Sequence, residues 1–324
     1  MAKGGTSMKM NIAVSINQAF IRYLYVMLVS LFENNRRQNL CVWLMSADLT
    51  DAQVYIFEEL AQSYGQELRF IRIGKELFPK DLPFTEQITI ETYFRLALPD
   101  LLPDELERVL YLDADIIINQ PLDEFYFRDF EGKSLCVCRD VTAASAAHIS
   151  TSPMFAELRE KPGFTYFNAG VLLMNLKKLR EKVTLEYFVQ QALRLKDHLT
   201  YHDQDLLNYL FYGDVIYADE KRFNLIIRPA CNSGFTYEEI KDMAAILHYA
   251  GPKPWRHEEV RYELERFWWE YAKMTPYYVE LLEDIVLGEI HTGSLDQLYR
   301  DLKQENDELR QIVDKCMALL QKLS

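Results

Sequence analysis

The stretch LERVLYLDADIII, residues 106–118, places two aspartates inside an apolar run. Residues 109–112 have the length and the β-branched or aromatic character of a buried strand, and residues 116–118 would extend it. Asp113 and Asp115 interrupt this run. An unpaired carboxylate in a protein core is costly. The pair therefore indicates a bound cation, a basic partner, or the end of a strand where the chain meets water.

The segments before this run alternate between strand-like and helix-like patterns. A strand-like stretch over 11–16 is followed by an amphipathic helix that ends at 33–35. Two more strand-like stretches, 40–46 and 68–73, are separated by a helix that begins at Asp51. This β-α-β-α-β order predicts an α/β fold with a doubly wound, mainly parallel sheet flanked by helices. Ligands of such sheets lie at the carboxyl ends of the strands, where the two aspartates are expected.

The chain of 324 residues divides by pattern into five segments. Residues 1–9 are expected to be a cloning remnant, and residues 10–255 form the main domain. The remaining segments are an aromatic helical extension over 256–287, broken at Pro276, a linker over 288–294 and a coiled-coil-like helix over 295–324.

The last segment carries a heptad pattern. One heptad position is filled by Leu295, Leu302, Leu309, Cys316 and Leu323. The flanking positions are acidic in the first half of the segment and lysine in the second half, so an antiparallel pair of helices would bring opposite charges together. We therefore predict an antiparallel homodimer through residues 295–323. A helix folded back on its own catalytic domain is the alternative.

Composition excludes several classes of partner. The formal net charge is −13 and the basic residues form no run, which argues against a nucleic-acid partner. Five scattered cysteines without a CxxC spacing indicate reduced thiols. No apolar run approaches the roughly 18 residues of a transmembrane span, so we expect a cytoplasmic protein. The aromatic residues within 268–278 allow peripheral contact with the inner face of the membrane, although packing is the favoured interpretation.

Asp113 and Asp115 have the spacing of half a site for a hard metal ion. Residues two apart on a strand point the same way, so both carboxylates would face one cation. Mg²⁺ or Mn²⁺ bound in this manner usually completes its coordination with phosphate oxygens and water, which predicts a phosphate-bearing substrate. For the pair alone a second interpretation stays open, in which the aspartates end the strand and pair with a base such as Arg108.

His248 and Lys253 add support to the metal interpretation. His248 follows the strand-like stretch 244–247, and Lys253 comes shortly after it on a Gly/Pro loop. An imidazole as the third ligand favours Mn²⁺ over Mg²⁺. The ammonium group of Lys253 would neutralise a diphosphate.

Four motifs occur in an order and spacing that we associate with one family. They are VLYLDADIIIN (109–119), YFNAGVLLMNL (166–176), HDQDLLN (202–208) and LHYAGPKPW (247–255). Together they resemble the retaining glycosyltransferases of family 8, which include bacterial lipooligosaccharide galactosyltransferases and glycogenin. The resemblance covers residues 10 to about 285.

The resemblance implies that the main domain is a Rossmann-like GT-A catalytic domain that binds a UDP-sugar. Mn²⁺ would be held by Asp113, Asp115 and His248. The donor-binding positions that it carries over are Asn17, Arg95, Asp113, Ala114, Asp115, Gly251 and Lys253. The catalytic positions are Asp140 and Asn168, which line the sugar pocket, and Asp203 and Gln204, which lie beside the anomeric carbon.

Two departures from the family pattern concern the donor. The first loop commonly reads Asp-x-Asn-Tyr, whereas this chain has Asn17-Gln18-Ala19-Phe20. The side-chain carbonyl of Asn17 can still accept a hydrogen bond from the uracil N3–H, but Ala19 offers none. The loop between Gly251 and Lys253 is also one residue shorter than its commonest form. Donor affinity or base selectivity is expected to differ accordingly.

The sequence therefore predicts a Mn²⁺-dependent, anomer-retaining enzyme. It would transfer galactose or glucose from UDP to a glycan, glycolipid or glycoprotein acceptor. One alternative is a catalytically decayed nucleotide-sugar-binding scaffold, which Ala19 favours. Another is a haloacid-dehalogenase-like phosphatase, because that class also has a strand ending in DxD. Against the phosphatase, three elements precede the aspartates, and Ile117 occupies the place where that class has Thr or Val.

Overall fold

The computed structural model describes residues 8–79, 82, 90–256 and 262–292, together with 300, 303, 304, 310 and 313. By its internal contacts the chain forms two units. The first comprises residues 1–251 and 262–275, and the second comprises residues 252–261 and 276–324. Every site residue predicted above belongs to the first unit except Lys253, which belongs to the second.

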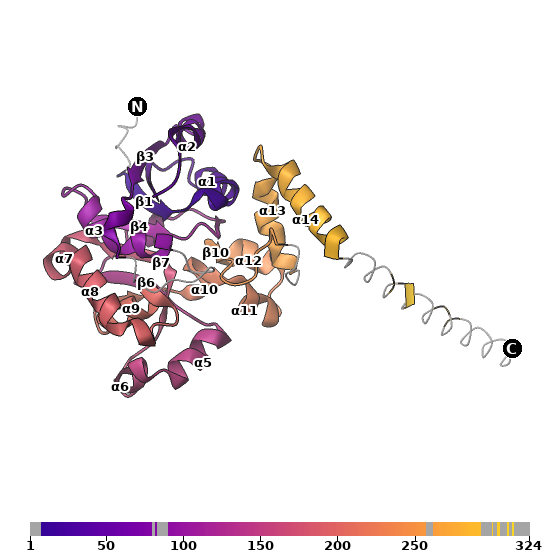
Figure 1. The fold of residues 1–324 in the computed structure, drawn as a ribbon. Coiled ribbons are helices and arrows are strands. Elements are labelled where there is room, and N and C mark those ends of the chain that lie inside the picture. Colours follow the sequence, from indigo (N-terminus) through magenta and orange to yellow (C-terminus); the bar gives the residue numbers. More distant parts are fainter. Residues whose placement is uncertain are drawn as a thin grey trace, which may run out of the picture. The chain divides into compact units, whose positions relative to one another are not determined.

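Within the described residues, a seven-stranded sheet forms the centre of the first unit (Figure 1). Its order is β3-β2-β1-β4-β7-β6-β8. The strands are β1 (Met10–Ser15), β2 (Leu40–Ser46), β3 (Glu67–Arg72), β4 (Arg108–Leu112), β6 (Leu135–Arg139), β7 (Phe167–Asn175) and β8 (Val215–Tyr217). Strands β3, β2, β1 and β4 are parallel, and β7 is antiparallel to both β4 and β6. The mainly parallel sheet predicted from the sequence is confirmed.

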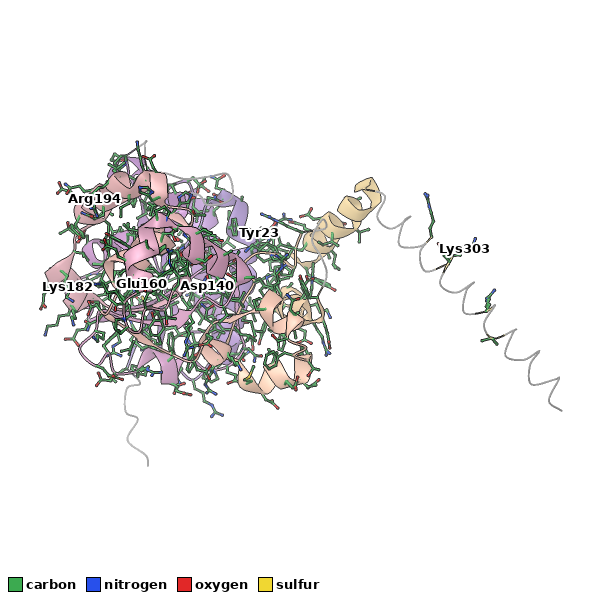
Figure 2. The ribbon with its side chains drawn as sticks, turned by 90° about the horizontal axis from the view of Figure 1, so that it is seen from below. Tyr23, Asp140, Glu160, Lys182, Arg194 and Lys303 are labelled. Carbon is green, nitrogen blue, oxygen red and sulfur yellow. The ribbon has the colours of Figure 1, made fainter. Side chains whose placement is uncertain are left out.

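Apolar helices and loops cover both faces of this sheet. Ile12 and Val14 of β1 pack into one core with α1 (Ile21–Asn34) and α2 (Asp51–Ser63). Ala13 points into the other core with η3 (Ile90–Ala97), α3 (Leu98–Leu101), α7 (Leu176–Lys182), α8 (Leu185–Leu195) and α9 (His202–Leu210). Because both faces are buried, β1, β2, β4 and β7 are mostly continuous buried runs rather than alternating ones, whereas β3 at the edge is only partly buried. Arg194 lies on the exposed side of α8 (Figure 2).

The expected single strand over 109–118 is wrong. The chain leaves β4 at Leu112, turns through Asp113–Asp115 and enters β5 (Ile116–Ile118). Strand β5 belongs to a second, three-stranded sheet with β10 (Ile246–His248) and β9 (Leu225–Ile226), in the order β5-β10-β9. Since both apolar runs are buried on either side of the turn, hydrophobicity alone does not reveal the break. The two aspartates therefore flank a turn and do not share one strand face.

The segment that precedes β4 is mostly a 3₁₀-helix. Residues Ile90–Ala97 form η3, and only Leu98–Leu101 form an α-helical turn, α3. The Nε of Arg95 donates a hydrogen bond of 2.8 Å to the backbone carbonyl of Thr92. In an α-helix that oxygen would accept a backbone N–H four residues later. The side chain of Arg95 thus bonds to the backbone of its own helix.

The remaining helices of the first unit are short. They are α4 (Asp123–Tyr126), α5 (Ala143–Thr151), α6 (Ala156–Arg159), α10 (Glu220–Phe223), α11 (Ile227–Asn232), α12 (Tyr237–Met243) and α13 (Arg266–Ala272). Short 3₁₀ turns occur at η1 (Gln18–Phe20), η2 (Lys75–Leu77), η4 (Pro153–Phe155), η5 (Lys196–His198) and η6 (Glu263–Glu265). Trp268 of α13 is fully buried, which agrees with packing as the role of this aromatic side chain.

The second unit contains α14 (Tyr278–Thr292), which begins after the predicted break at Pro276. The linker expected over 288–294 is wrong for residues 288–292, because they continue α14. A single glycine such as Gly288 costs only about 1 kcal/mol within a helix and does not end it. Apart from five isolated positions, the tail over 295–324 lies outside the described residues, and its homodimer stays a prediction. Among the helices described, none is both long and apolar enough to cross a membrane.

Candidate active site

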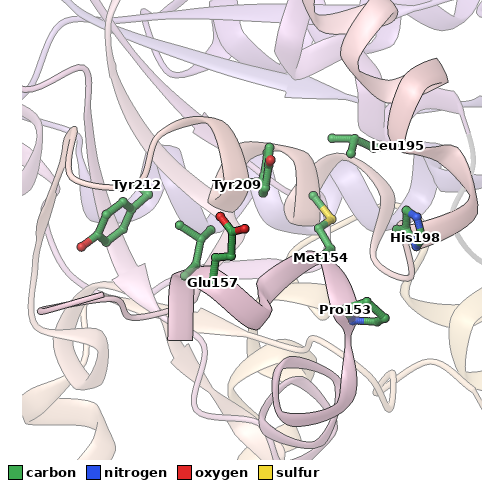
Figure 3. A pocket seen from close by; sticks show the side chains of 8 residues that line it. Pro153, Met154, Glu157, Leu195, His198, Tyr209 and Tyr212 are labelled. Atoms are coloured by element: carbon green, nitrogen blue, oxygen red, sulfur yellow. The ribbon is translucent and has the colours of Figure 1, made fainter. Parts of the chain in front are cut away.

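Among the cavities on the first unit, two have nearly the same volume. One, of about 550 Å³, is lined by the predicted residues Asp140, Asn168, Gln204 and Gly251. The other, of about 520 Å³, lies between the segment around Met154 and the end of α9, and none of the predicted residues lines it (Figure 3). Volume therefore does not separate the two cavities. The first is the candidate for substrate because it holds the predicted chemistry.

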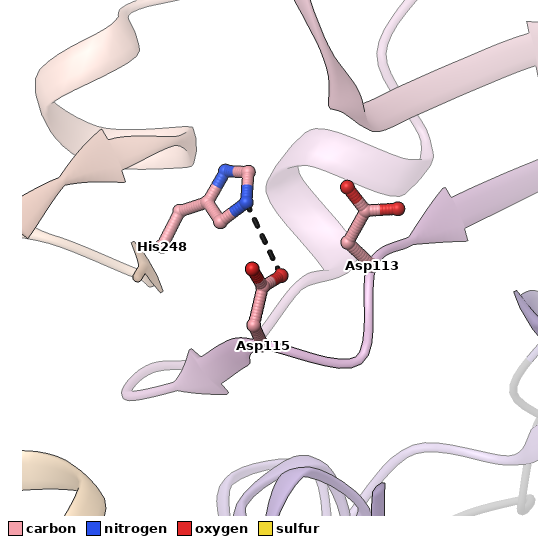
Figure 4. A group of neighbouring side chains, drawn as sticks. All are labelled: Asp113, Asp115 and His248. Atoms are coloured by element: carbon pink, nitrogen blue, oxygen red, sulfur yellow. Dashed lines mark ion pairs between the residues drawn. The ribbon is translucent and has the colours of Figure 1, made fainter. Parts of the chain in front are cut away.

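The predicted metal ligands come together beside the turn from β4 to β5 (Figure 4). His248 is the last residue of β10 and pairs in register with Ile116 of β5. The ligand atoms of Asp113, Asp115 and His248 all lie within 4.8 Å of one another. The Nε2 of His248 is 3.3 Å from an Oδ1 of Asp115. Antiparallel pairing of β5 with β10 thus brings a distant histidine to the two carboxylates.

Gly170 of β7 keeps the centre of this cluster clear. A Cβ at this position would lie 2.4 Å from the Cε1 of His248 and 2.7 Å from the Oδ2 of Asp113. Both distances are shorter than real Cβ contacts, so a side chain there would displace the ligands. Two carboxylates and one imidazole suit a divalent cation such as Mn²⁺ or Mg²⁺. The residues present therefore fit such an ion.

Asn224 and Asn168 fix the orientation of the His248 ring. The Oδ1 of Asn168 accepts the backbone N–H of Gly170 at 3.0 Å, so this atom is an oxygen. The amide nitrogen of Asn224 donates to the same Oδ1 at 3.0 Å, which turns its own oxygen toward His248. That oxygen lies 2.9 Å from the Nδ1 of His248 and accepts its proton. The Nε2 is then left as the metal-binding nitrogen.

Arg95 sits buried between two carboxylates. Its Nη2 lies 3.1 Å from Asp113, and its Nε lies 3.0 Å from Asp203. The guanidinium also lies 4.5 Å above the ring of Tyr111, whose hydroxyl donates to Asp113 at 2.9 Å. Asp113 is therefore held in place from two sides. The contact of Arg95 with a donor stays a prediction.

Burial and pairing shift the pKa values of this group in a consistent way. Burial disfavours the charged form of Arg95, but Asp113 and Asp203 outweigh it and raise the pKa of Arg95 above its ordinary value. Burial raises the pKa of Asp203 to about 6, although Arg95 opposes that shift. The arginine therefore stays charged, and its two carboxylates share one positive charge.

A second group of predicted residues is joined by amide hydrogen bonds. The Nε2 of Gln204 donates to Asp140 at 3.1 Å. The Oε1 of Gln204 accepts from the Nδ2 of Asn168 at 3.2 Å and from the backbone N–H of Ala169 at 2.9 Å. Thr142 donates its hydroxyl to Asp140 at 2.6 Å. These residues form one wall of the cavity. Asn168 links this wall to Asn224 and so to the His248 ring.

Asp205 anchors the start of α9, where Asp203 and Gln204 lie. Its carboxylate is fully buried and accepts four hydrogen bonds. The donors are the backbone N–H groups of Thr200 and Tyr201, the Tyr166 hydroxyl and the Nε2 of His148. This arrangement fixes the turn that presents Asp203 and Gln204 to their separate partners.

Four predicted residues lie outside these two groups. The Oδ1 of Asn17 accepts the backbone N–H of Ala19 at 3.1 Å and caps η1. Ala114 is buried in the turn between the two aspartates. Gly251 lines the cavity with a φ of +102°, a conformation that favours glycine. Lys253 belongs to the second unit, so its role at the diphosphate stays a prediction.

Sequence reasoning missed Gly170, Asn224 and Asp205. Gly170 left a signal, because a lone glycine inside an apolar strand indicates a close approach of other atoms. Asp205 is the second acid of the HDQD motif, but nothing in the motif gives it a separate role. Asn224 precedes a strand of only two residues, and no local pattern marks it.

Comparison with known proteins identifies the family of this chain. Residues 11–259 match the sequence model of glycosyl transferase family 8, and the chain belongs to that family. The lipopolysaccharide 1,3-galactosyltransferase of Salmonella typhimurium is 28% identical over 83% of this chain and 79% of its own length. A lipopolysaccharide 1,2-glucosyltransferase of Escherichia coli is 26% identical over 78% of this chain and 74% of its own.

Solved structures extend the likeness to the fold. The galactosyltransferase LgtC, in complex with donor and acceptor sugar analogues, is 27% identical and superposes with a TM-score of 0.68. The match covers 82% of this chain and 96% of LgtC. An active-site mutant of LgtC gives a TM-score of 0.70. The predicted GT-A fold and the predicted enzyme class, glycosyltransferase, are confirmed, which sets the phosphatase alternative aside.

Proposed function

We propose that the protein transfers galactose or glucose from UDP to a glycan acceptor with retention of the anomeric configuration. The observation that carries the proposal is that hydrogen bonds connect two sites, a metal-ligand set and a cavity. Asp113, Asp115 and His248 form a metal-ligand set, and the chain from His248 through Asn224 to Asn168 leads to the wall of the cavity. A diphosphate at the first site would place its sugar in the second.

Mn²⁺ is the cation that fits this donor set best, with Mg²⁺ as the alternative, because one of the three ligands is a nitrogen. Bound there, it would neutralise charge on a diphosphate leaving group. Arg95 would keep the Asp113 carboxylate in position for this work. Lys253 would add a second positive charge at the diphosphate.

The amide-bonded residues would hold the sugar. Gln204 and Asn168 offer amide groups, and Asp140 offers a carboxylate, all of which can exchange their mutual hydrogen bonds for sugar hydroxyls. Asp203 is 3% exposed and paired with Arg95, so it is poorly placed to act as a nucleophile. This favours a route in which the acceptor hydroxyl attacks from the side that UDP leaves. The C1–O bond to UDP breaks, the new C1–O bond forms, and the hydroxyl proton passes to the departing diphosphate.

Galactose and glucose are proposed because the relatives named above include a galactosyltransferase and a glucosyltransferase. A glycan or glycolipid acceptor is proposed for the same reason, since both relatives are named for lipopolysaccharide. A glycoprotein acceptor is an alternative within the same reaction.

A screen of nucleotide sugars for acceptor-free nucleotide release tests the donor. We expect release from UDP-galactose or UDP-glucose in the presence of Mn²⁺ to exceed release from GDP- and CMP-sugars. Asp115→Ala should abolish this release. Asp104→Ala, at an exposed carboxylate outside the site, should leave it unchanged. Preference for a GDP- or CMP-sugar, or near-normal release by Asp115→Ala, would contradict the proposal.

A further inference from the structure

The cavity has one charged side chain that the reaction described above does not use. Arg228, in the first turn of α11, lines it together with the catalytic candidates Gln204 and Asn168. Asp140 is the other charged group among the lining residues. Its oxygens already accept hydrogen bonds from Thr142 and Gln204. Arg228 is therefore the lining side chain that an anionic group of a ligand can pair with.

Arg228 lacks an ion pair of the kind that Arg95 and Arg266 form within the described part of the first unit. Arg95 is neutralised by two aspartates, and Arg266 lies 3.0 Å from Glu270. Arg228 is exposed, and no carboxylate among the described residues forms an ion pair with it. Its Nε donates a hydrogen bond of 3.3 Å to the hydroxyl of Tyr262. That bond orients the guanidinium through Nε and leaves the two terminal nitrogens for a ligand.

The lining around Arg228 suits a sugar that carries an acidic group. Val141, Ala143 and Ala144 give an apolar surface, on which the face of a pyranose ring can lie. Asn232 and Ser233 offer short polar side chains for hydroxyl groups. A guanidinium binds carboxylate and phosphate oxygens in a bidentate manner. The combination matches an anionic sugar better than a neutral one.

We propose that Arg228 selects an acceptor sugar that carries a phosphate or carboxylate group. This inference rests on the proposed function, which assigns the donor diphosphate to the metal ligands and Lys253. The positive charge of the Arg228 guanidinium is then left for the second substrate. Arg228 is thus a specificity-determining residue on the acceptor side.

Binding of three simple acceptors tests this inference. The probes are methyl β-galactoside, its uronic acid counterpart and its 6-phosphate, each titrated into full-length protein saturated with Mn²⁺ and UDP. The dissociation constants are measured for the wild type, Arg228→Gln, Arg228→Lys and the matched control Arg194→Gln on α8. We expect one of the charged glycosides to bind about 10-fold to 100-fold more tightly than the neutral one, as a charge-assisted bond to a guanidinium provides.

The variants separate the source of the preference. Arg228→Gln should remove the preference, and Arg194→Gln should keep it. Arg228→Lys should retain more of the preference for a phosphate than for a carboxylate. A phosphate can bind the point charge of lysine, whereas a carboxylate needs the paired N–H groups of a guanidinium. Which of the two charged glycosides binds more tightly identifies the acidic group. Neutral and charged glycosides that bind equally, no detectable binding of either charged one, or a preference that survives Arg228→Gln would overturn the inference.

Acceptor-free UDP-hexose hydrolysis distinguishes this inference from the proposed function. Arg228→Gln should hydrolyse the donor with an unchanged KM. A KM for the donor raised 10-fold or more would assign Arg228 to the donor and overturn the inference. Absence of hydrolysis in the wild type would count against the proposed function, while the binding experiment would still decide the role of Arg228.

Discussion

The two groups of residues in the site hold their carboxylates by different means. In the charged cluster, defined as Arg95, Tyr111, Asp113 and Asp203, a buried guanidinium is paired with two carboxylates. In the amide cluster, defined as Asp140, Asn168, Gln204 and Asn224, neutral amides bond to each other and to one carboxylate.

This difference separates rigidity from exchange. Removing either partner of a buried ion pair lowers the stability of the folded protein strongly. The charged cluster therefore holds one geometry. Amide hydrogen bonds at a cavity wall contribute little net free energy, since water or a sugar hydroxyl can replace either partner. The charged cluster is therefore suited to position a metal ligand, and the amide cluster is suited to receive a neutral sugar.

Gly170→Ala should have the largest effect, because it fills the space between the clusters. The added Cβ would lie 2.4 Å from His248 and 2.7 Å from Asp113. Displacement of the ligands by about 1 Å should lower turnover at least about 100-fold and weaken Mn²⁺ binding, as calorimetry would measure. Gly213→Ala is the control, since its φ of +75° brings backbone strain but its Cβ meets nothing within 4 Å. Wild-type Mn²⁺ affinity in Gly170→Ala would show that the cluster is not a metal site.

Arg95→Met tests the rigidity of the charged cluster. Removing the guanidinium leaves the buried Asp203 and the partly buried Asp113 without their cation, which should lower the free energy of unfolding by about 3–5 kcal/mol in metal-free protein. Arg72→Met breaks the exposed pair of Arg72 with Asp51, 2.8 Å apart, and should cost less than about 1 kcal/mol. Urea denaturation measures both. Equal costs for the two variants would mean that the cluster does not hold a fixed geometry.

Asn224→Ala tests the link between the clusters. Without the Asn224 oxygen, the His248 ring loses the acceptor that holds its Nδ1 proton, and Mn²⁺ affinity should fall about 10-fold to 100-fold. Asn224→Asp keeps an acceptor and should retain more of the affinity. Asn119→Ala is the control, because its amide bonds to the backbone of Lys241 and Ala244, outside the site. An unchanged affinity in Asn224→Ala would leave the ring orientation without a function.

Asp203→Asn probes the smallest effect, the dependence of stability on pH. The folded-state pKa of Asp203, about 6, is above its ordinary value of 3.8, so the folded state binds this proton more tightly. The protonated Asp203 carboxyl therefore stabilises the folded state. This contribution is complete below the ordinary pKa and is lost as the pH rises through about 6. Between about pH 4 and pH 6 the wild type should lose up to about 1 kcal/mol per pH unit relative to the variant. The free energies of unfolding of the wild type and the variant are measured in EDTA. A constant difference between them at all pH values would refute the raised pKa of Asp203.

The sequence predicted the parts of the fold that depend on local patterns. The alternating segments from β1 to β3 have their expected order, and β2 has the expected bounds Leu40–Ser46. Motif resemblance located Asp113, Asp115 and His248. The sequence did not reveal that β4 and β5 enter different sheets, because both are apolar and buried.

The supporting contacts of the site were beyond local patterns for a physical reason. The bond of Asn224 to Asn168 and the pairing of Arg95 with Asp203 join residues far apart in the chain. Each depends on the packing of whole strands and helices, and no periodicity in the sequence encodes such contacts. Only the glycine within β7 gave a local signal, since its missing side chain is itself a requirement of the packing.

Binding of UDP in the presence and absence of Mn²⁺ tests the central claim most directly. Calorimetric titration of UDP into the wild type should give measurable binding with Mn²⁺ and none with EDTA, because the diphosphate is expected to reach Asp113, Asp115 and His248 through the ion. In Asp115→Ala, UDP should fail to bind even with Mn²⁺, and in Asp104→Ala it should bind as in the wild type. UDP binding of equal strength with EDTA, or in Asp115→Ala, would contradict the assignment of these three residues as a metal site for a nucleoside diphosphate.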